Sequence, residues 1–220
     1  MDLPIKKNIN KVKRNLEEQK HSLIKNWRKN RVITTESVLR AFRSVHREIF
    51  VDPSYNDNSY SDNPLPIGSG QTISQPTTVA MMLQLLNILP GNCVLEIGTG
   101  SGYNAALLAN LAKFVVTIER HEKLVEKARK NLLYVGLDNI KVIEGDGKLG
   151  YVNHAPYDRI IITAAADKVP QNLKDQLIIG GFIVAPIGPT YGCEMHKIQK
   201  ISQNNFQTSS HGFFSFVPLI

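Results

Sequence analysis

The chain has 220 residues, of which 42% are hydrophobic and 20% charged, with 15 glycines and 11 prolines. This composition is typical of a globular protein and excludes disordered, collagen-like and coiled-coil chains. No apolar run approaches the ~18 residues that a membrane span needs, and the basic N-terminus lacks the apolar core of a secretory signal. We therefore expect a cytoplasmic protein without membrane contacts.

The net charge of +7 is unevenly distributed along the chain. Residues 1–50 contain 13 Lys and Arg against 5 Asp and Glu, a net charge of +8, whereas residues 51–220 contain 13 against 14, a net charge of −1. A basic segment can bind nucleic acid or an acidic surface. No five-residue basic block is present, however, and apolar residues at helical spacing interrupt the charges. We favour a solvated helical face.

The two cysteines, Cys93 and Cys193, cannot form a disulfide framework, and no CxxC or Cys/His cluster indicates a metal site. We interpret both as buried small side chains of a protein in a reducing compartment.

The first part of the chain predicts three helices and a long polar segment. Apolar residues at helical spacing give the first two helices one apolar face each: Leu16, Leu23, Ile24 and Trp27 in the first, and Val38, Ala41, Phe42, Val45 and Ile49 in the second, with Thr35 as its N-cap. The polar segment 52–70 is rich in proline and glycine and long for a loop without a role. The sequence QTISQP at 71–76 then precedes a helix over 79–89.

From residue 93 on, short apolar runs alternate with helical segments. The runs cover 93–97, 114–118, 140–143, 159–163 and 181–187, and the helical segments cover 103–111, 122–135 and 170–177. This alternation predicts an α/β fold with a doubly wound, mostly parallel sheet covered on both faces. Ligands of such sheets bind outside the carboxyl ends of the strands. The segment 212–219 predicts a further strand, for which an antiparallel position is one option.

The segment 94–103 (VLEIGTGSGY) ends a strand in alternating glycines and starts a helix at once. Glycine permits positive φ and a close approach of the backbone to a ligand. The dinucleotide fingerprint GxGxxG, and with it a nicotinamide-dependent oxidoreductase, is disfavoured because Tyr103 stands in place of the third glycine. Glu96 lies two positions before Gly98, where a carboxylate would repel a pyrophosphate and suit a ligand that carries a cation.

An acidic residue followed by GxGxG resembles the class I S-adenosylmethionine methyltransferases. Two further landmarks fall where that family has them: Glu119 at the end of the run 114–118, and Asp146 after the run 140–143. The resemblance implies that Glu119 binds both ribose hydroxyls and that Asp146 accepts the adenine amine. The chemistry agrees, because hydroxyls and amines donate hydrogen bonds and a carboxylate accepts them.

The segment Thr163-Ala164-Ala165-Ala166, after the fourth run, limits the methyl acceptor. It lacks the D/N-P-P-Y/F sequence of enzymes that methylate exocyclic amines of DNA, a cysteine for methylation at pyrimidine C5, and a His/Asp pair for general-base catalysis. A carboxylate acceptor fits such a site, because it is about 99.9% ionised at pH 7 and can attack the methyl group directly. The site then orients the reactants and excludes water.

Residues 64–76 (PLPIGSGQTISQP) resemble the signature of the protein-L-isoaspartate (D-aspartate) O-methyltransferase family. Similar segments continue along the chain at 94–103, 145–147, 156–160, 163–166, 169–170, 176–177, 180–181, 186–188 and 216–219. The segment 38–51, which includes Arg47-Glu48, is similar to that family's second helix. The resemblance covers nearly the whole chain.

This resemblance implies an enzyme that transfers the methyl group of S-adenosylmethionine to the α-carboxylate of L-isoaspartyl residues in damaged proteins, after which the ester collapses to a succinimide. Ser74 matches the residue treated as the active-site serine, although a helix N-cap is the other interpretation of it. Thr72, Ser74 and Val217 match substrate-side groups. The residues that would line the cofactor, without any metal, are Gln71, Thr72, Ile73, Ser74, Glu96, Gly98, Gly100, Ser101, Glu119, Arg120, Asp146 and Gly147.

Two departures from the family pattern are visible. His46 stands where many relatives have proline, and the chain stops at Ile220, where many relatives continue with residues that help to close the substrate pocket. We expect one compact, monomeric molecule in which a helical and substrate-loop segment, 1–78, packs on a catalytic core, 79–220. Its partners would be isoaspartyl proteins and peptides. The alternatives are a methyltransferase of the same fold for RNA or a specialised peptide, steered by the basic N-terminal segment, and a non-catalytic binding module.

Overall fold

The computed structural model describes the backbone of residues 3–220 and the side chains of residues 12–220. The helices are α1 (Leu3–Lys29), α2 (Glu36–Ser44), α3 (Pro76–Leu86), α4 (Tyr103–Ala109), α5 (Glu122–Tyr134) and α6 (Gln171–Asp175). The strands are β1 (Leu65–Gly68), β2 (Gln71–Ile73), β3 (Cys93–Ile97), β4 (Phe114–Glu119), β5 (Ile140–Glu144), β6 (Tyr157–Ile162), β7 (Leu177–Ile187), β8 (Tyr191–Ser202) and β9 (Asn205–Ser215). Short 3-10 turns occur at Arg47–Ile49, Pro53–Asn58, Gly147–Leu149 and Val152–His154.

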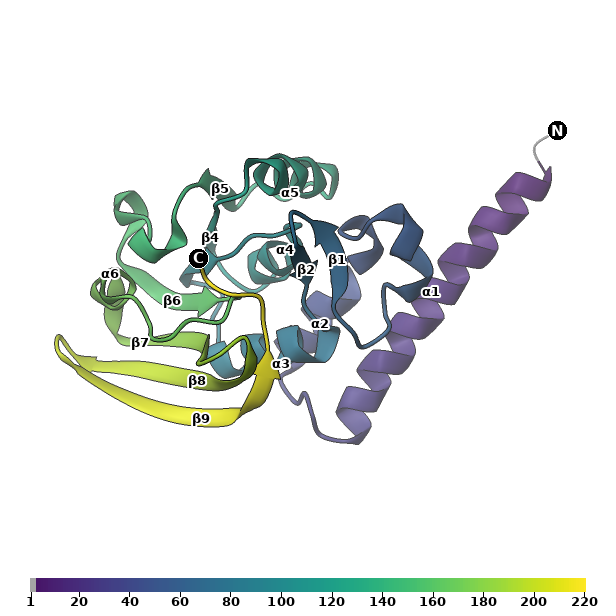
Figure 1. Ribbon diagram of the computed structural model, residues 1–220. Helices are drawn as coiled ribbons and strands as arrows, with labels where there is room; N and C mark the ends of the chain where they lie inside the picture. Colours follow the sequence, from purple (N-terminus) through teal and green to yellow (C-terminus); the bar gives the residue numbers. More distant parts are fainter. Residues whose placement is uncertain (1–2) are drawn as a thin grey trace.

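A seven-stranded sheet in the order β5-β4-β3-β6-β7-β8-β9 forms the centre of the molecule (Figure 1). The strands β3 to β7 pair in parallel, whereas β8 and β9 complete the sheet as an antiparallel ribbon. The predicted doubly wound, mostly parallel sheet is confirmed. The chain proceeds from β3 outward to β4 and β5, then returns to β6 on the other side of β3. This reversal beside β3 is where ligands of open α/β sheets bind.

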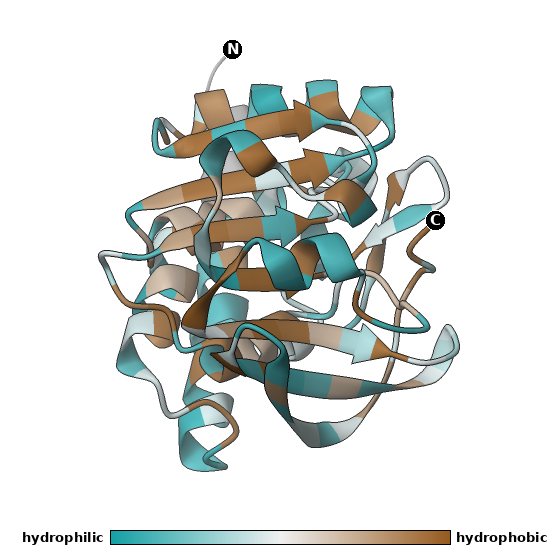
Figure 2. Cartoon of the chain, turned by 90° about the vertical axis from the view of Figure 1, so that its left-hand side faces the viewer, coloured by the Kyte–Doolittle hydropathy of each residue, from teal (hydrophilic) through white to brown (hydrophobic). Residues whose placement is uncertain are grey.

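The sheet is covered on both faces, as the continuous apolar strands require. Alternate strand residues such as Val94 and Val115 pack with α3, α4 and α5 in one hydrophobic cluster, and their neighbours Leu95 and Val116 pack with α6 in another. Figure 2 shows the strands as mostly hydrophobic bands between helices and loops of mixed or polar character.

The N-terminal helices share the first of these clusters with the sheet. Trp27 of α1 packs edge to face on Phe42 of α2 with ring centroids 5.0 Å apart, and Phe42 packs in the same way on Tyr103 of α4 at 6.2 Å. The apolar face predicted for α1 is correct, because Leu16, Ile24 and Trp27 are buried. No helix within the described range is long and apolar enough to cross a bilayer.

Several predicted boundaries are wrong. The second helix ends at Ser44 rather than Ile49. Thr35 is its N-cap residue, as predicted, but its hydroxyl donates to Gln84 Oε1 at 3.1 Å instead of capping the helix. The third helix begins at Pro76. The segment expected to be irregular contains β1, which forms a hairpin with β2, and the long ribbon of β8 and β9 was predicted only at its end. Polar, half-exposed ribbons lack the apolar signal that identifies a buried strand.

Candidate active site

A cavity opens at the carboxyl ends of β3, β4 and β6. The residues that line it are Gln71, Thr72, Ile97, Gly98, Gly100, Ile118, Glu119, Arg120, His121, Gly147, Thr163, Ala164, Val217, Pro218, Leu219 and Ile220. The C-terminus lies between the sheet and the β1–β2 hairpin, so three distant parts of the chain enclose the cavity (Figure 1).

Two glycines keep the cavity floor free of side chains. Gly98 has φ +94°, and a Cβ there would collide with the Thr163 hydroxyl, which donates to the carbonyl of Gly98 at 2.8 Å. A Cβ at Gly147 would collide with the Ile97 side chain. The glycines of both loops are therefore sterically required, and a ligand can lie directly against backbone there.

Glu119 is the predicted acidic residue that lines the cavity. Its Oε1 accepts hydrogen bonds from the backbone N–H groups of Arg120 and His121, each at 3.0 Å, and its Oε2 accepts one from Gly100 at 2.9 Å. A carboxylate has about four acceptor positions. Three are used by backbone N–H groups, of which only that of Gly100 belongs to the glycine loop, so a position on Oε2 is left for a ligand hydroxyl.

Glu96 is fully buried beneath the glycine loop and does not line the cavity. Its carboxyl group accepts hydrogen bonds from Asn104 Nδ2 at 2.7 Å and from the Thr117 hydroxyl at 2.5 Å. Burial raises the pKa of Glu96 to about 8, although these two hydrogen bonds oppose the shift. Contrary to the sequence-based expectation, Glu96 is largely uncharged at pH 7 and positions the start of α4 through Asn104.

Asp146 is exposed and outside the cavity wall, whereas its neighbour Gly147 is part of that wall. Its Oδ1 accepts the backbone N–H of Lys148 at 2.9 Å and so caps the 3-10 turn that follows β5. The cap fixes the turn at the mouth of the cavity.

Ser74 lies beside this cavity rather than on its wall: the cavity shares Thr72 and Thr163 with a small pocket and with a neighbouring groove, both of which Ser74 lines. It lines a small pocket together with Thr72, Ile73, Ser101 and Thr163, and it also lines the groove, which runs past Gln75, Tyr191, Phe213 and Val217. The N-cap of α3 is Gln75, so the alternative interpretation of Ser74 as an N-cap is wrong. Because capping does not use the Ser74 hydroxyl, that group is suited to a ligand.

The C-terminal segment forms one wall of the cavity. Ala165 donates its N–H to the carbonyl of Val217 at 2.8 Å, and Leu219 donates its N–H to the carbonyl of Ala165 at 2.7 Å. Sequence reasoning assigned no site role to Thr163, Ala164, His121 or residues 218–220. The position of Thr163 directly after a parallel strand was a usable signal, whereas the chain end was expected at this edge only through the family resemblance, which placed Val217 on the substrate side.

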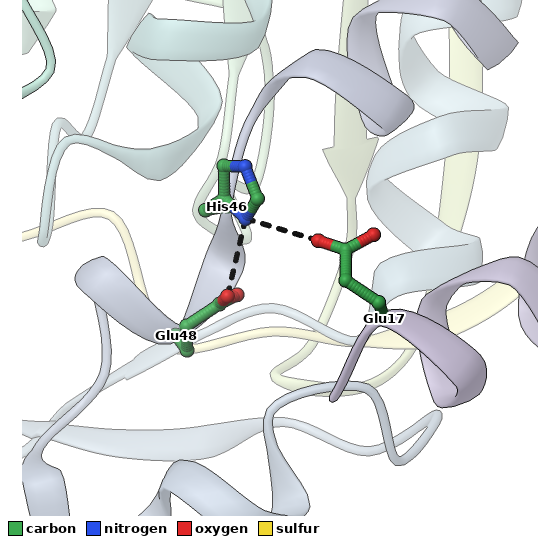
Figure 3. A group of neighbouring side chains, drawn as sticks. All are labelled: Glu17, His46 and Glu48. Carbon is green, nitrogen blue, oxygen red and sulfur yellow. Dashed lines mark hydrogen bonds and ion pairs between the residues drawn. The ribbon is translucent and has the colours of Figure 1, made fainter. Parts of the chain in front are cut away.

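A separate cluster of possible metal ligands lies between α1 and the turn Arg47–Ile49 (Figure 3). His46 Nδ1 is 3.3 Å from a carboxylate oxygen of Glu17 and 3.2 Å from one of Glu48. The Lys20 ammonium already pairs with Glu17 at 3.1 Å, and the Tyr60 hydroxyl donates to Glu48 at 2.6 Å. Because a cation and a hydroxyl donor engage both acids, we interpret the cluster as a link between these two elements.

The open sheet, its glycine loop after β3 and the carboxylate at the end of β4 define a class I methyltransferase. A family model described as Protein-L-isoaspartate(D-aspartate) O-methyltransferase (PCMT) matches residues 18–220. The chain therefore belongs to the PCMT family.

Curated relatives and a solved structure agree with this assignment. The chain is 52% identical over 190 residues to a protein-L-isoaspartate O-methyltransferase of Methanoregula boonei, covering 86% of this chain and 87% of that one. It is 48% identical over 202 residues to one of Thermococcus sibiricus, covering 90% and 91%. A crystal structure from Plasmodium falciparum, described as this enzyme in complex with S-adenosyl-L-homocysteine, matches with a TM-score of 0.80 and 25% identity, covering 90% and 97%.

Proposed function

We propose that the chain is a protein-L-isoaspartate O-methyltransferase, which esterifies the α-carboxylate of L-isoaspartyl residues and so starts their repair through a succinimide. The observation that carries this proposal is that a strand-end cavity with a bare backbone floor and an open groove share Thr72 and Thr163, with Ser74 on the groove side. The first space fits a nucleoside cofactor, and the second is open enough for a polypeptide.

The strand-end cavity fits S-adenosylmethionine, whose sulfonium methyl group can be accepted by a carboxylate oxygen without prior deprotonation. Glu119 offers its remaining acceptor position to a ribose hydroxyl, and the floor at Gly98, Gly100 and Gly147 admits the ligand against backbone. The further cofactor contacts that we propose are Gln71, Thr72, Ile73, Ser74, Ser101, Arg120 and Asp146, while Glu96 acts indirectly from beneath the loop.

On the substrate side, we assign Thr72, Ser74 and Val217 to the isoaspartyl peptide. The Ser74 hydroxyl would donate to the acceptor carboxylate and hold it in line with the methyl group. The groove contains no charged side chain among its lining residues, so an anionic acceptor meets no repelling carboxylate there. In this arrangement the segment 1–78 contributes mainly to the substrate side, and 79–220 to the cofactor side.

The direct test is methyl transfer to matched peptides that differ only in an Asp or an isoAsp residue. With labelled S-adenosylmethionine, we expect a base-labile methyl ester on the isoAsp peptide alone. Equal labelling of both peptides, or label that resists base, would overturn the proposed function.

Ser74→Ala tests the assigned catalytic residue. We expect kcat on the isoAsp peptide to fall about 10- to 100-fold, as for the loss of one hydrogen bond to a charged group, while binding of S-adenosylhomocysteine measured by calorimetry changes little. Thr208→Ala, on the exposed ribbon of β9, provides the control. Turnover that stays unchanged in Ser74→Ala would remove this role.

Nucleic acid binding is not favoured, because the family assignment points to a protein substrate. We propose that the enzyme acts as a monomer in the cytoplasm on isoaspartyl proteins and peptides. Sedimentation of the purified chain tests the oligomeric state.

A further inference from the structure

Arg47 is a buried cation without a carboxylate partner. Its exposed fraction is 0%, and the ion pairs formed by the described residues do not include it. Arginine is rarely buried completely unless it is paired, because removing the charge from water is costly. Asp62, the acid that acts on Arg47 from nearby, is itself bound to the backbone N–H and hydroxyl of Thr77 at 2.9 and 2.6 Å.

The guanidinium group is directed at backbone around the proposed active site. Its Nη1 donates to the carbonyl oxygen of Ser74 at 2.9 Å, and its Nη2 donates to that of Asn63 at 3.5 Å. Its carbon lies 5.2 Å from the centre of the Tyr103 ring, which is also buried and starts α4 directly after the glycine loop. Arg47 therefore connects the serine on the substrate side with the first residue of the helix on the cofactor side.

The position of Arg47 is itself fixed. Its backbone N–H donates to the Tyr60 hydroxyl at 3.2 Å, and that hydroxyl donates to Glu48 at 2.6 Å. Only its Nε has no hydrogen-bond partner within the described part of the chain. A side chain held at both ends in this way can transmit a defined orientation to the peptide unit that it contacts.

We propose that Arg47 is a positioning residue for methyl transfer, which fixes the peptide unit between Ser74 and Gln75 and thereby orients the Ser74 hydroxyl toward the acceptor carboxylate. This role rests on the proposed function of Ser74. The peptide unit is planar, so a hydrogen bond to its carbonyl oxygen sets the backbone torsion next to the Ser74 side chain. Lysine could keep the charge at this position, but it lacks the planar pair of donors that reaches two carbonyl groups.

The test is a double-mutant cycle of Arg47→Lys and Ser74→Ala, with kcat/KM on an isoAsp peptide as the readout. Alone, Arg47→Lys should lower kcat/KM roughly tenfold, the scale of one hydrogen bond to a charged group. In the Ser74→Ala background the same change should have almost no effect, because residues that act through one another are not additive. Binding of S-adenosylhomocysteine should stay within about twofold, or about 0.4 kcal/mol.

Arg159→Lys is the matched control. Arg159 is also buried, at 6% exposure, and its guanidinium likewise donates to backbone carbonyls, those of Asn87 at 3.1 Å and Asp158 at 2.8 Å, and lies 4.8 Å from the Phe182 ring. It does not line the cavity or the groove. We expect Arg159→Lys to lower the melting temperature without lowering kcat/KM of the folded enzyme.

The outcomes separate this role from a purely structural one. Additive effects of Arg47→Lys and Ser74→Ala, or a parallel loss in Arg159→Lys at equal stability, would overturn the positioning role and leave the proposed function intact. An unaltered chain that methylates no isoAsp peptide would overturn both. Lysine retains the buried charge, so Arg47→Lys is expected to fold where Arg47→Met would fail, and its melting curve checks this directly.

Discussion

At the scale of single residues, three acidic side chains that look equivalent in the sequence have three different environments. Glu119 faces the cavity and accepts three backbone N–H groups, one from Gly100 of the glycine loop and two from Arg120 and His121. Glu96 is buried beneath that loop, and Asp146 caps an exposed turn. Each of them lies near the carboxyl end of a parallel strand, but the neighbours supplied by the fold decide which carboxylate can reach a ligand.

Glu96 predicts a dependence of stability on pH. Its pKa is about 8 in the folded chain and near 4.5 when unfolded, so between these values the folded state binds more protons, and stability falls as pH rises. Glu96→Gln does not titrate. Its free energy of unfolding relative to the unaltered chain should therefore increase from pH 5 to pH 8, by a few kcal/mol in order of magnitude.

Urea denaturation at four pH values between 5 and 8 measures this difference. Glu144→Gln, at an exposed end of β5, is the control and should show no such trend. A constant difference between Glu96→Gln and the unaltered chain would show that Glu96 is charged in the folded state.

Glu119→Ala should weaken cofactor binding, because it removes the acceptor of a ribose hydroxyl and releases the N–H of Gly100. Loss of hydrogen bonds to a charged group costs roughly 1.5–3 kcal/mol, or about 10- to 150-fold in the Kd of S-adenosylhomocysteine. Calorimetry provides the Kd, with the exposed Glu122→Ala as the control. Identical affinities in both variants would refute the ribose assignment.

At the scale of elements, the substrate side is assembled from parts that have little stability alone. The hairpin of β1 and β2 contains only seven residues in its strands, and an isolated two-stranded hairpin is at best marginally stable in water. It is supported by α1 and α3: Trp27 Nε1 donates to the Thr77 hydroxyl at 2.7 Å, and Thr77 follows Ser74 by three residues. The long α1 therefore stabilises the segment that contains Ser74.

Trp27→Ala should destabilise the whole chain and not only its N-terminus. The side chain is 2% exposed, and truncation of a buried tryptophan typically costs about 3–5 kcal/mol. Trp27→Phe keeps most of the packing and should lose about 1 kcal/mol with the hydrogen bond. Chemical denaturation followed by circular dichroism measures both.

The control for Trp27→Ala is Leu133→Ala, since Leu133 of α5 is 80% exposed. If Trp27→Ala lowered the free energy of unfolding no more than Leu133→Ala does, α1 would be an appendage that does not support the core.

At the scale of the whole molecule, the charge distribution distinguishes between the two candidate substrates, an isoaspartyl peptide and RNA. The net charge of +8 belongs to residues 1–50. Within this segment, the described side chains of residues 12–50 line neither the cavity nor the groove. The groove has no charged lining residue. The basic segment therefore attracts a substrate only over a distance from the groove, and salt screens such long-range attraction.

The rate of methylation of an isoAsp peptide with zero net charge should consequently change by no more than about twofold between 50 and 200 mM salt. Binding to a nucleic acid through six or more phosphate contacts would instead weaken by about a thousandfold or more over this range. Parallel titrations of peptide methylation and of a fluorescent RNA oligonucleotide compare the two. Tight RNA binding at 150 mM salt that inhibits peptide methylation would favour the alternative substrate.

Local sequence patterns were sufficient for the central sheet. The strands β3, β4, β6 and β7 consist largely of buried apolar residues whose burial does not depend on detailed neighbours, so the parallel fold and its ligand-binding edge could be predicted. The glycines at 98 and 147 were also informative, because only glycine fits beside Thr163 and Ile97. These signals, with the resemblance at residues 64–76, gave the family directly.

Tertiary contacts decided the rest, because they depend on residues far apart in the chain. The hydrogen bonds that Glu96 accepts come from Asn104 and Thr117, the wall formed by residues 217–220 requires Ala165, and the bond from Arg47 reaches Ser74 across 27 positions. Burial, pKa and side-chain orientation are properties of an assembled environment, which periodicity and composition do not encode. The sequence by itself thus determined the sheet and the family, and the folded chain determined which side chains face the ligands.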